Sequence, residues 1–406
     1  MRESERPGNG RTVPPGSRLH EVSTGSAQFS AKIALIPARV KGPKIPVQSK
    51  LDQVLNEAAI AVSDQHRGTI LREWDRLAGP GPTLTGEQRV RIAAAARRAC
   101  KLGAPPPEAN PLIEAVAWIR CDPGGITDPF VDELSRRGLD RLMLAEVIGV
   151  VSRLAAIDSF STGVGAEHIP LPTPFSGEPT SRIHRKAAMH VSWVPTIRKQ
   201  VGPLGALRAL PTEQDAIIDI HDNLYLSRHQ MRTNTFDHVL TRPQLELVAG
   251  RCGFLNECEH VMVTHAQMLR RSCRSDPRLN LLSITALDPV DAGIEDGLAL
   301  IALTDAVHAE SPQLLEVARQ GLAHQGDDAV REAIAVAANF QMMCRVLSAT
   351  GLSATDLHPR IREQLGYNPN DGETLAQDPQ SIDTQTHPAA AGSARQIPMV
   401  RISASG

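Results

Sequence analysis

Aromatic residues are scarce in this chain of 406 residues, which has seven Phe, three Trp and two Tyr. Its core must therefore be built mainly from Ala, Leu, Val and Ile, a composition that favours helices. No run reaches the roughly 18 continuous apolar residues that a membrane span requires. The polar opening, residues 1–17, also lacks the apolar region of a secretory signal. We therefore predict a soluble, cytoplasmic, all-α protein that does not enter a membrane.

Neither charge is in excess, because 43 basic residues face 45 acidic ones, for a net charge of −2. This balance argues against a nucleic acid or an anionic membrane surface as a partner. One basic cluster stands out, which we interpret as a solvated helix face. It consists of Arg89, Arg91, Arg97, Arg98 and Lys101.

The cysteines lack the close pairs of a disulfide framework. Six occur in the whole chain, and no secretory signal precedes them. We predict reduced thiols, most of them acting as small apolar residues in helices. They are Cys100, Cys121, Cys252, Cys258, Cys273 and Cys344.

Composition divides the chain into five parts. Residues 1–45 and 361–406 are rich in Gly, Pro, Ser and other polar residues, and we predict that both tails are disordered. Strong helical periodicity fills residues 46–168 and 212–360, whereas residues 169–211 are rich in proline. The pattern predicts two helical modules joined by a Pro-rich junction.

The second module resembles a copy of the first. Residues 145–165 align with residues 331–351 at an offset of 186, and residues 84–99 align with residues 240–255 at an offset of 156. The offsets differ by 30 residues, so the second copy contains about one extra helix with its connector. Because Val90 stands where the second copy has Glu246, we predict that the first module has lost the site and kept the scaffold.

The second copy carries an acid, a thiol and an imidazole: Glu246 lies in the aligned helix, and Cys258 and His265 lie in the extra segment that follows it. A helix that starts after an Asn256 cap would place Cys258 in its first turn, where backbone N–H groups stabilise a thiolate. Cys258, Val261 and His265 then share one helix face. A glutamate that packs against this histidine would form a pair able to transfer protons near neutral pH.

This layout resembles the alkylhydroperoxidase D-like family, also called carboxymuconolactone decarboxylase-like. Redox members of that family have a glutamate, a Cys-x-x-Cys pair that starts twelve residues later, and a histidine four residues after the second cysteine. Here Glu246, Cys258 and His265 match three of these positions, and Val261 replaces the second cysteine. The resemblance implies two tandem all-α modules packed as a pseudo-dimer, or a homo-oligomer, acting on a small molecule without a metal or cofactor.

Val261 bears on the chemistry, because a valine neither attacks a peroxide nor resolves a disulfide. The leading hypothesis is a Glu246/His265 proton relay with Cys258 nearby, working on a small organic substrate by acid–base or non-standard thiol chemistry. A thiol peroxidase that pairs Cys258 with Cys252 or Cys273 is one alternative. A catalytically silent helical interaction module is another.

Other residues near the motif extend the predicted site. His260 adds a ligand type suited to zinc, but on a continuous helix it points away from Cys258 and His265, so we predict no metal site. We place His260, Asn339 and Trp193 as substrate-binding residues. Asn339 occupies the position of Arg153 in the repeat, and such polar residues in apolar helices also form hydrogen bonds between helices.

Overall fold

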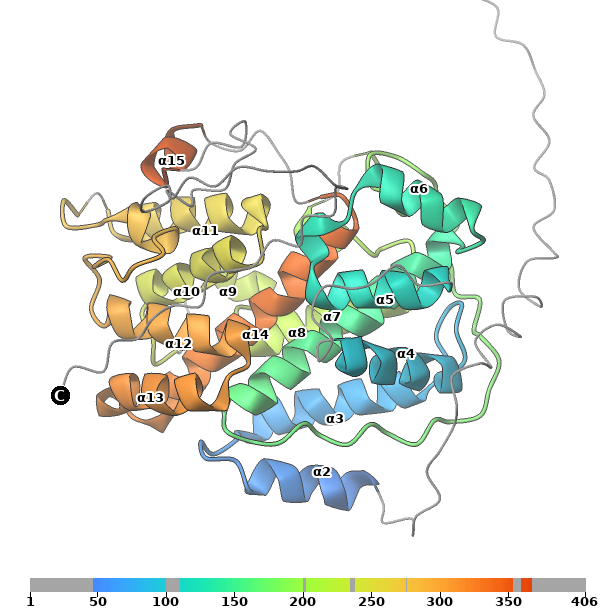
Figure 1. Cartoon of the computed structure of the whole chain (residues 1–406), viewed down its shortest axis with the longest axis horizontal. Coiled ribbons are helices and arrows are strands. Elements are labelled where there is room, and N and C mark those ends of the chain that lie inside the picture. The colour runs from blue at the N-terminus through green and yellow to red at the C-terminus, as the bar shows by residue number, and fades with distance from the viewer. Residues whose placement is uncertain are drawn as a thin grey trace, which may run out of the picture. The chain divides into compact units, whose positions relative to one another are not determined.

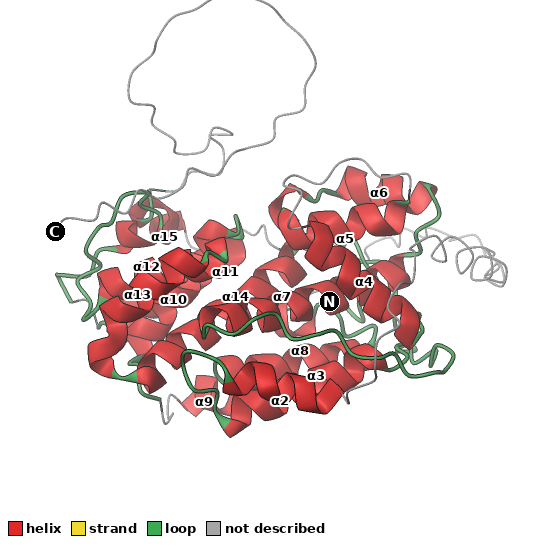
Figure 2. Ribbon diagram, turned by 60° about the horizontal axis from the view of Figure 1, so that its bottom comes forward, coloured by secondary structure: helices red, strands yellow, loops and turns green. Residues whose placement is uncertain are grey.

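The structure is a computed structural model, and it describes residues 47–99, 110–199, 202–233, 238–274, 276–352 and 359–366. These residues form α-helices and four short 3₁₀ helices, η1–η4, and no strand occurs among them (Figures 1 and 2). The prediction of an all-α fold is confirmed. The α-helices are α2 (Val47–Asn56), α3 (Asp64–Ala78), α4 (Gly86–Ala99), α5 (Pro111–Cys121), α6 (Asp128–Arg136), α7 (Arg141–Gly163), α8 (Pro211–Leu224), α9 (Arg228–Thr233), α10 (Arg242–Leu255), α11 (Glu259–Ser272), α12 (Gly297–Ala309), α13 (Pro312–Leu322), α14 (Asp327–Ala349) and α15 (Pro359–Gln364).

Local sequence explains where several helices begin. Ser63 caps α3 by accepting from the backbone N–H of His66, Asn110 caps α5, and Asp140 caps α7. The periodic stretch 51–77 is therefore two helices rather than one, because α2 ends at Asn56 before the cap of α3. Within the described part of the chain, no helix has both the length and the apolar composition needed to cross a bilayer.

Two helices after the junction have the same lengths as two helices before it. Helices α4 and α10 each have 14 residues, and α7 and α14 each have 23. The caps of α4 and α10 also match: the backbone N–H of Thr85 donates to Gln88 Oε1, and that of Thr241 donates to Gln244 Oε1, both at 2.8 Å. These pairs lie at the offset of 156 that aligns the two copies.

A second feature shared by the two parts is a hydrogen bond between a glutamate of the long helix and the backbone that precedes α4 or α10. Glu146 of α7 accepts from the backbone N–H of Thr83 at 2.6 Å, and Glu332 of α14 accepts from that of Leu240 at 2.7 Å. A carboxylate on each long helix, fully buried for Glu146 and partly buried for Glu332, thus satisfies a backbone donor that precedes α4 or α10.

Helices α7 and α14 lie side by side at the centre of the described region (Figures 1 and 2). Nearly all their residues are buried, and Gly163 of α7 faces Ile334 of α14. A methyl group on Gly163 would lie only 2.4 Å from Cγ2 of Ile334. The absence of a side chain at Gly163 therefore permits this contact.

Gly163→Ala is expected to lower the free energy of unfolding by about 1–3 kcal/mol, because the added methyl overpacks the α7/α14 contact. Removing Cγ2 with Ile334→Ala should recover part of this loss in the double variant, measured as a coupling energy by urea denaturation. Gly321→Ala in α13 is the matched control, since its nearest neighbour, Cβ of Ala299, lies 3.8 Å away. Equal effects of the two glycine substitutions would contradict the proposed contact.

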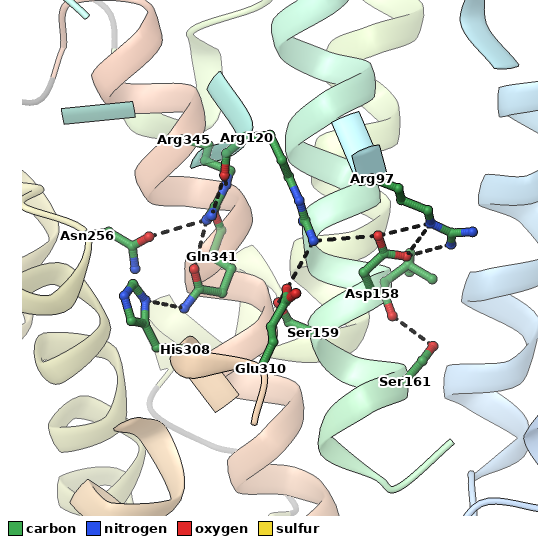
Figure 3. A network of polar contacts seen from close by, with 11 residues as sticks. Arg97, Arg120, Asp158, Ser159, Ser161, Asn256, His308, Glu310, Gln341 and Arg345 are labelled. Carbon is green, nitrogen blue, oxygen red and sulfur yellow. Dashed lines mark hydrogen bonds and ion pairs between the residues drawn. The ribbon is translucent and has the colours of Figure 1, made fainter. Parts of the chain in front are cut away.

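A buried polar network joins α5 and α7 to α12 and α14 (Figure 3). Arg120 donates to Glu310 Oε1 at 3.0 Å, and Arg345 donates to the backbone carbonyl of Arg120 at 2.9 Å. Arg345 also donates to Gln341 Oε1 at 2.7 Å, and Gln341 contacts His308 Nδ1. Burial, Arg345 and Arg251 lower the pKa of His308 to about 4, so this histidine is neutral. Charged hydrogen bonds therefore connect the two halves of the described region.

The basic cluster predicted as a solvated face is directed partly inward. Arg89 is buried and donates to both Glu146 and Glu213 at 2.7 Å, and Arg97 pairs with Asp158 at 2.6 Å. The predicted solvated face is wrong for these two arginines, because carboxylates of α7 and α8 pair with them. Lys101 lies outside the described residues.

The folded region extends past residue 360, where the sequence predicts a tail. Helix α15 packs against α11, and Ile361 and Leu365 are buried. The hydroxyl of Thr285 donates to the carbonyl of Leu365 at 2.7 Å. The predicted boundary is therefore too early, because these apolar residues find a covering surface only in the tertiary structure. The predicted N-terminal tail, 1–45, and the rest of the C-terminal one lie outside the described residues.

Candidate functional site

Helices α10 and α11 bring Glu246 and His265 together. Nδ1 of His265 lies 2.5 Å from Oε2 of Glu246, and both residues are buried. Tyr225, which follows α8, donates its hydroxyl to Oε1 of Glu246 at 2.8 Å. Arg242, one turn before Glu246 on α10, forms an ion pair with the same oxygen. The carboxylate is thus held from three sides.

These contacts keep the carboxylate ionised in a buried place. Burial alone would raise the pKa of Glu246, but His265, Arg242 and Tyr225 outweigh it, so the pKa lies below its usual value. Burial and the charge of Glu246 raise the pKa of Tyr225 well above its usual value. Tyr225 therefore remains a neutral hydrogen-bond donor to a charged Glu246.

His265 lies in the wall of a cavity of about 400 Å³. Residues of α8, α9, α11 and α14 and of the segment before α8 surround it, and most of their side chains are apolar. The ring of Phe340 packs edge-on against His265, with centroids 4.5 Å apart, and Tyr225 packs against both rings. Glu246 lies behind His265 and does not line the cavity.

The hydrogen bond to Glu246 assigns different roles to the two ring nitrogens. A carboxylate accepts but does not donate, so Nδ1 of His265 carries a proton. No described residue bonds Nε2. In the neutral ring, Nε2 has a free lone pair at the cavity wall, which is the position required for a general base.

The Cys258 thiol lies away from this cavity. Cys258 is the N-cap of α11, is fully buried and is absent from the cavity lining. Its partner is Cys344 of α14, a thiol that the sequence did not connect with it. The contact with Cys344 lowers the pKa of Cys258 most, burial raises it, and the backbone N–H of Val261 lowers it, leaving it below the usual value.

Asn256 was predicted to cap the helix of Cys258, and this prediction is wrong. Asn256 is the C-cap of α10, and its side chain donates to the carbonyl of Cys252 at 2.8 Å. Glu257 has φ of +50°, so the chain reverses between the two helices and moves the cap to Cys258.

The two cysteines considered as substitutes for the missing thiol lie elsewhere. Cys252 donates to the carbonyl of Ala337, and burial and Asp305 raise its pKa far above the usual value. Cys273 ends α11, and burial and Asp276 raise its pKa too. Neither is among the groups that interact with the Cys258 thiol.

The three predicted substrate-binding residues have different locations. His260 lines the cavity, and burial and His265 lower its pKa. Asn339 is fully buried outside the lining, and its side-chain amide bonds no described residue. Trp193 also lies outside the lining: its ring packs on Gly351 after α14, and its backbone N–H donates to the backbone carbonyl of Thr350 at 3.0 Å.

The sequence did not single out several residues of the cavity wall. Two of them, Arg198 and Arg208, come from the junction before α8. His221 belongs to α8, and Tyr225 is the residue that follows it. Their only sequence signal is the concentration of polar residues around a proline-rich stretch, which does not indicate which helix they face.

The described residues contain no group of three or more His, Cys, Asp or Glu arranged to hold a metal ion. Comparisons with protein-family models, with curated proteins and with solved structures find no match to this chain.

Proposed function

We propose that this protein is an acid–base enzyme that moves a proton on a small, largely apolar organic substrate bound in the cavity beside His265. The observation that carries the proposal is the 2.5 Å contact between Glu246 and His265, formed where the imidazole meets the cavity. A Glu–His pair at the wall of a largely apolar cavity is suited to proton abstraction next to a carbonyl group.

In this mechanism, Nε2 of His265 accepts a proton from a carbon of the substrate, and the bonding electrons remain on the substrate as an enolate. Glu246 stabilises the imidazolium, while Tyr225 and Arg242 hold the carboxylate in place. Return of the proton to the same carbon gives exchange with solvent, and return to another atom gives an isomer.

We also propose that the chain consists of two modules similar to the alkylhydroperoxidase D-like family, packed as a pseudo-dimer with one retained site. The matched caps of α4 and α10 and the equal lengths of α7 and α14 support this proposal. On this view, the α7/α14 contact replaces a contact between subunits.

Solvent exchange tests the acid–base proposal. We expect the protein to catalyse deuterium incorporation into members of a panel of small ketones, keto acids and unsaturated lactones, followed by proton NMR in D₂O. His265→Ala should slow this exchange by about 10²–10⁴-fold, the usual contribution of a general base. His190→Ala, at an exposed histidine outside the cavity, is the matched control and should not change it.

Cysteine variants test the thiol alternative. Cys258→Ser should retain the exchange, because the thiol does not reach the cavity. Hydroperoxide consumption that disappears in both Cys258→Ser and Cys344→Ser, with exchange absent from the wild type, would instead assign the function to this thiol pair. If the wild type and all these variants lack both activities, an interaction module would be favoured.

A further inference from the structure

Two arginines line the cavity without a partner of their own. The side chains of Arg198 and Arg208 form no hydrogen bond or ion pair with any described residue. Arg208 is half-buried, just after the short helix η2 (Pro203–Gly205), and Arg198 is exposed. None of the described residues that line the cavity is acidic. The wall therefore carries two positive charges that nothing in it neutralises.

Other arginines in the described region show how this chain treats a guanidinium that it buries. Arg89, Arg153 and Arg251 are almost fully buried, and each is held by at least one carboxylate. Partial burial of Arg208 has a desolvation cost that no group of the described residues offsets. A guanidinium also offers a planar pair of donors that matches two oxygens of a carboxylate. The missing partner of Arg208 is thus best supplied by a bound anion.

The rest of the lining indicates what is attached to that anion. Methionine and leucine side chains from three different helices supply much of the wall, and they suit an unbranched or aromatic hydrocarbon group. They are Met231, Met268, Met343 and Leu347. The same lining includes the His265 ring, so one ligand can contact the arginine segment, the apolar wall and the histidine.

We propose that the cavity binds an amphipathic carboxylate, with its carboxylate on Arg208, assisted by Arg198, and its hydrocarbon part against the methionine wall beside His265. This inference rests on the proposed acid–base function and names its substrate class. The two arginines recognise the substrate, and His265 carries out the proton transfer.

Isothermal titration calorimetry with octanoate and octanamide tests the inference, because these probes share a chain and differ in charge. We expect octanoate to bind the wild type at least about ten-fold more tightly than octanamide, the usual scale of a charged hydrogen bond. Arg208→Gln should weaken octanoate binding by about ten-fold or more and leave octanamide binding unchanged. The affinity of Arg208→Lys for octanoate should lie between those of the wild type and of Arg208→Gln, because lysine keeps the positive charge but loses the planar pair of N–H donors.

Arg185→Gln is the matched control, since Arg185 is an exposed arginine of the same junction outside the cavity lining. It should bind octanoate like the wild type, and circular dichroism should show that all variants are folded. The inference is overturned by undetectable octanoate binding, by equal affinities for the acid and the amide, or by an Arg208→Gln variant that binds octanoate normally. Octyl phosphate that binds far more tightly than octanoate would also overturn the assignment to carboxylates.

His265→Ala separates this inference from the function on which it rests. That variant should lose proton exchange but bind octanoate within a few-fold of the wild type. Loss of exchange in His265→Ala together with normal octanoate binding in Arg208→Gln would overturn the anion site alone. Unchanged exchange in His265→Ala would overturn the proton-transfer function, whatever the octanoate affinities are.

Discussion

Glu246→Gln is expected to slow proton exchange by about 10²–10⁴-fold, close to the loss expected for removing the base itself. The glutamine keeps the size of the side chain and can still accept from Tyr225. It loses the negative charge that lies 2.5 Å from Nδ1 of His265 and that stabilises the imidazolium. The loss should therefore fall on the rate of proton transfer and leave substrate binding nearly unchanged.

Nitrogen-15 NMR of the histidines gives a readout that a purely structural role would not change. In the wild type, the carboxylate fixes the proton of His265 on Nδ1. In Glu246→Gln, the tautomer with the proton on Nε2 should become populated, because an amide can either donate or accept. Glu257→Gln in the turn after α10 is the control. A Glu246→Gln variant with full activity would remove Glu246 from the mechanism.

Glu213→Ala is expected to have the largest effect on stability, lowering the free energy of unfolding by about 3–5 kcal/mol. Glu213 lies at the start of α8 and pairs with Arg89 at 2.7 Å and with Arg153 at 2.8 Å, and all three side chains are buried. Its removal leaves two guanidinium groups to share the remaining carboxylates, Glu73 and Glu146. Urea denaturation should show the loss, with the milder Glu213→Gln as a second variant. Glu316→Ala, at a solvent-exposed glutamate, should cause no measurable change.

The pKa of Glu213 also predicts how the free energy of unfolding changes in acid. Burial would raise the pKa of Glu213, but Arg153 and Arg89 lower it to about 2, from 4.5 for a free glutamate. The folded state therefore binds this proton less readily than the unfolded state does. The stabilisation is fully present above about pH 4.5 and is lost as the pH falls towards 2.

The wild type should accordingly lose more stability between pH 4.5 and 2 than Glu213→Ala does. Glu146 in the same cluster has a raised pKa, caused by burial and by the charge of Glu213, and takes up its proton at higher pH. The difference between wild type and variant therefore contains the titration of Glu213 together with the change that its removal causes in Glu146. Parallel stability curves for the two proteins would contradict the predicted ionisation.

The charged residues around Glu213 pair between helices that are far apart in the chain, which explains why this cluster was not predicted. Arg89 was predicted to lie on a solvated face, because the spacing of basic residues on a helix does not reveal which other helix covers them. Glu213 belongs to α8, more than one hundred residues further along the chain. Only the packing of α8 against α3 and α7 brings these charges together.

The candidate site, too, was predicted only in part from the sequence. Glu246 and His265 were predicted as a pair from their spacing and from the family resemblance, and they lie in contact. Cys258 was predicted to join them, yet the turn at Glu257 directs its thiol to Cys344. The φ angle of Glu257 sets the direction of the Cys258 thiol, and helical periodicity carries no information about this angle.

The sequence by itself determined the all-α class, because helix formation depends on residues that are close in the chain. The Glu246/His265 pair was predicted from its spacing together with the family resemblance, since the two residues lie on different helices. The tertiary structure alone decided that His265 meets a cavity, that Cys258 does not, and that Arg208 and Tyr225 belong to the same site. These residues come from segments far apart in the chain, and their neighbours follow from how α8, α10, α11 and α14 pack. Packing of this kind depends on the shape of the whole core, which no local pattern specifies.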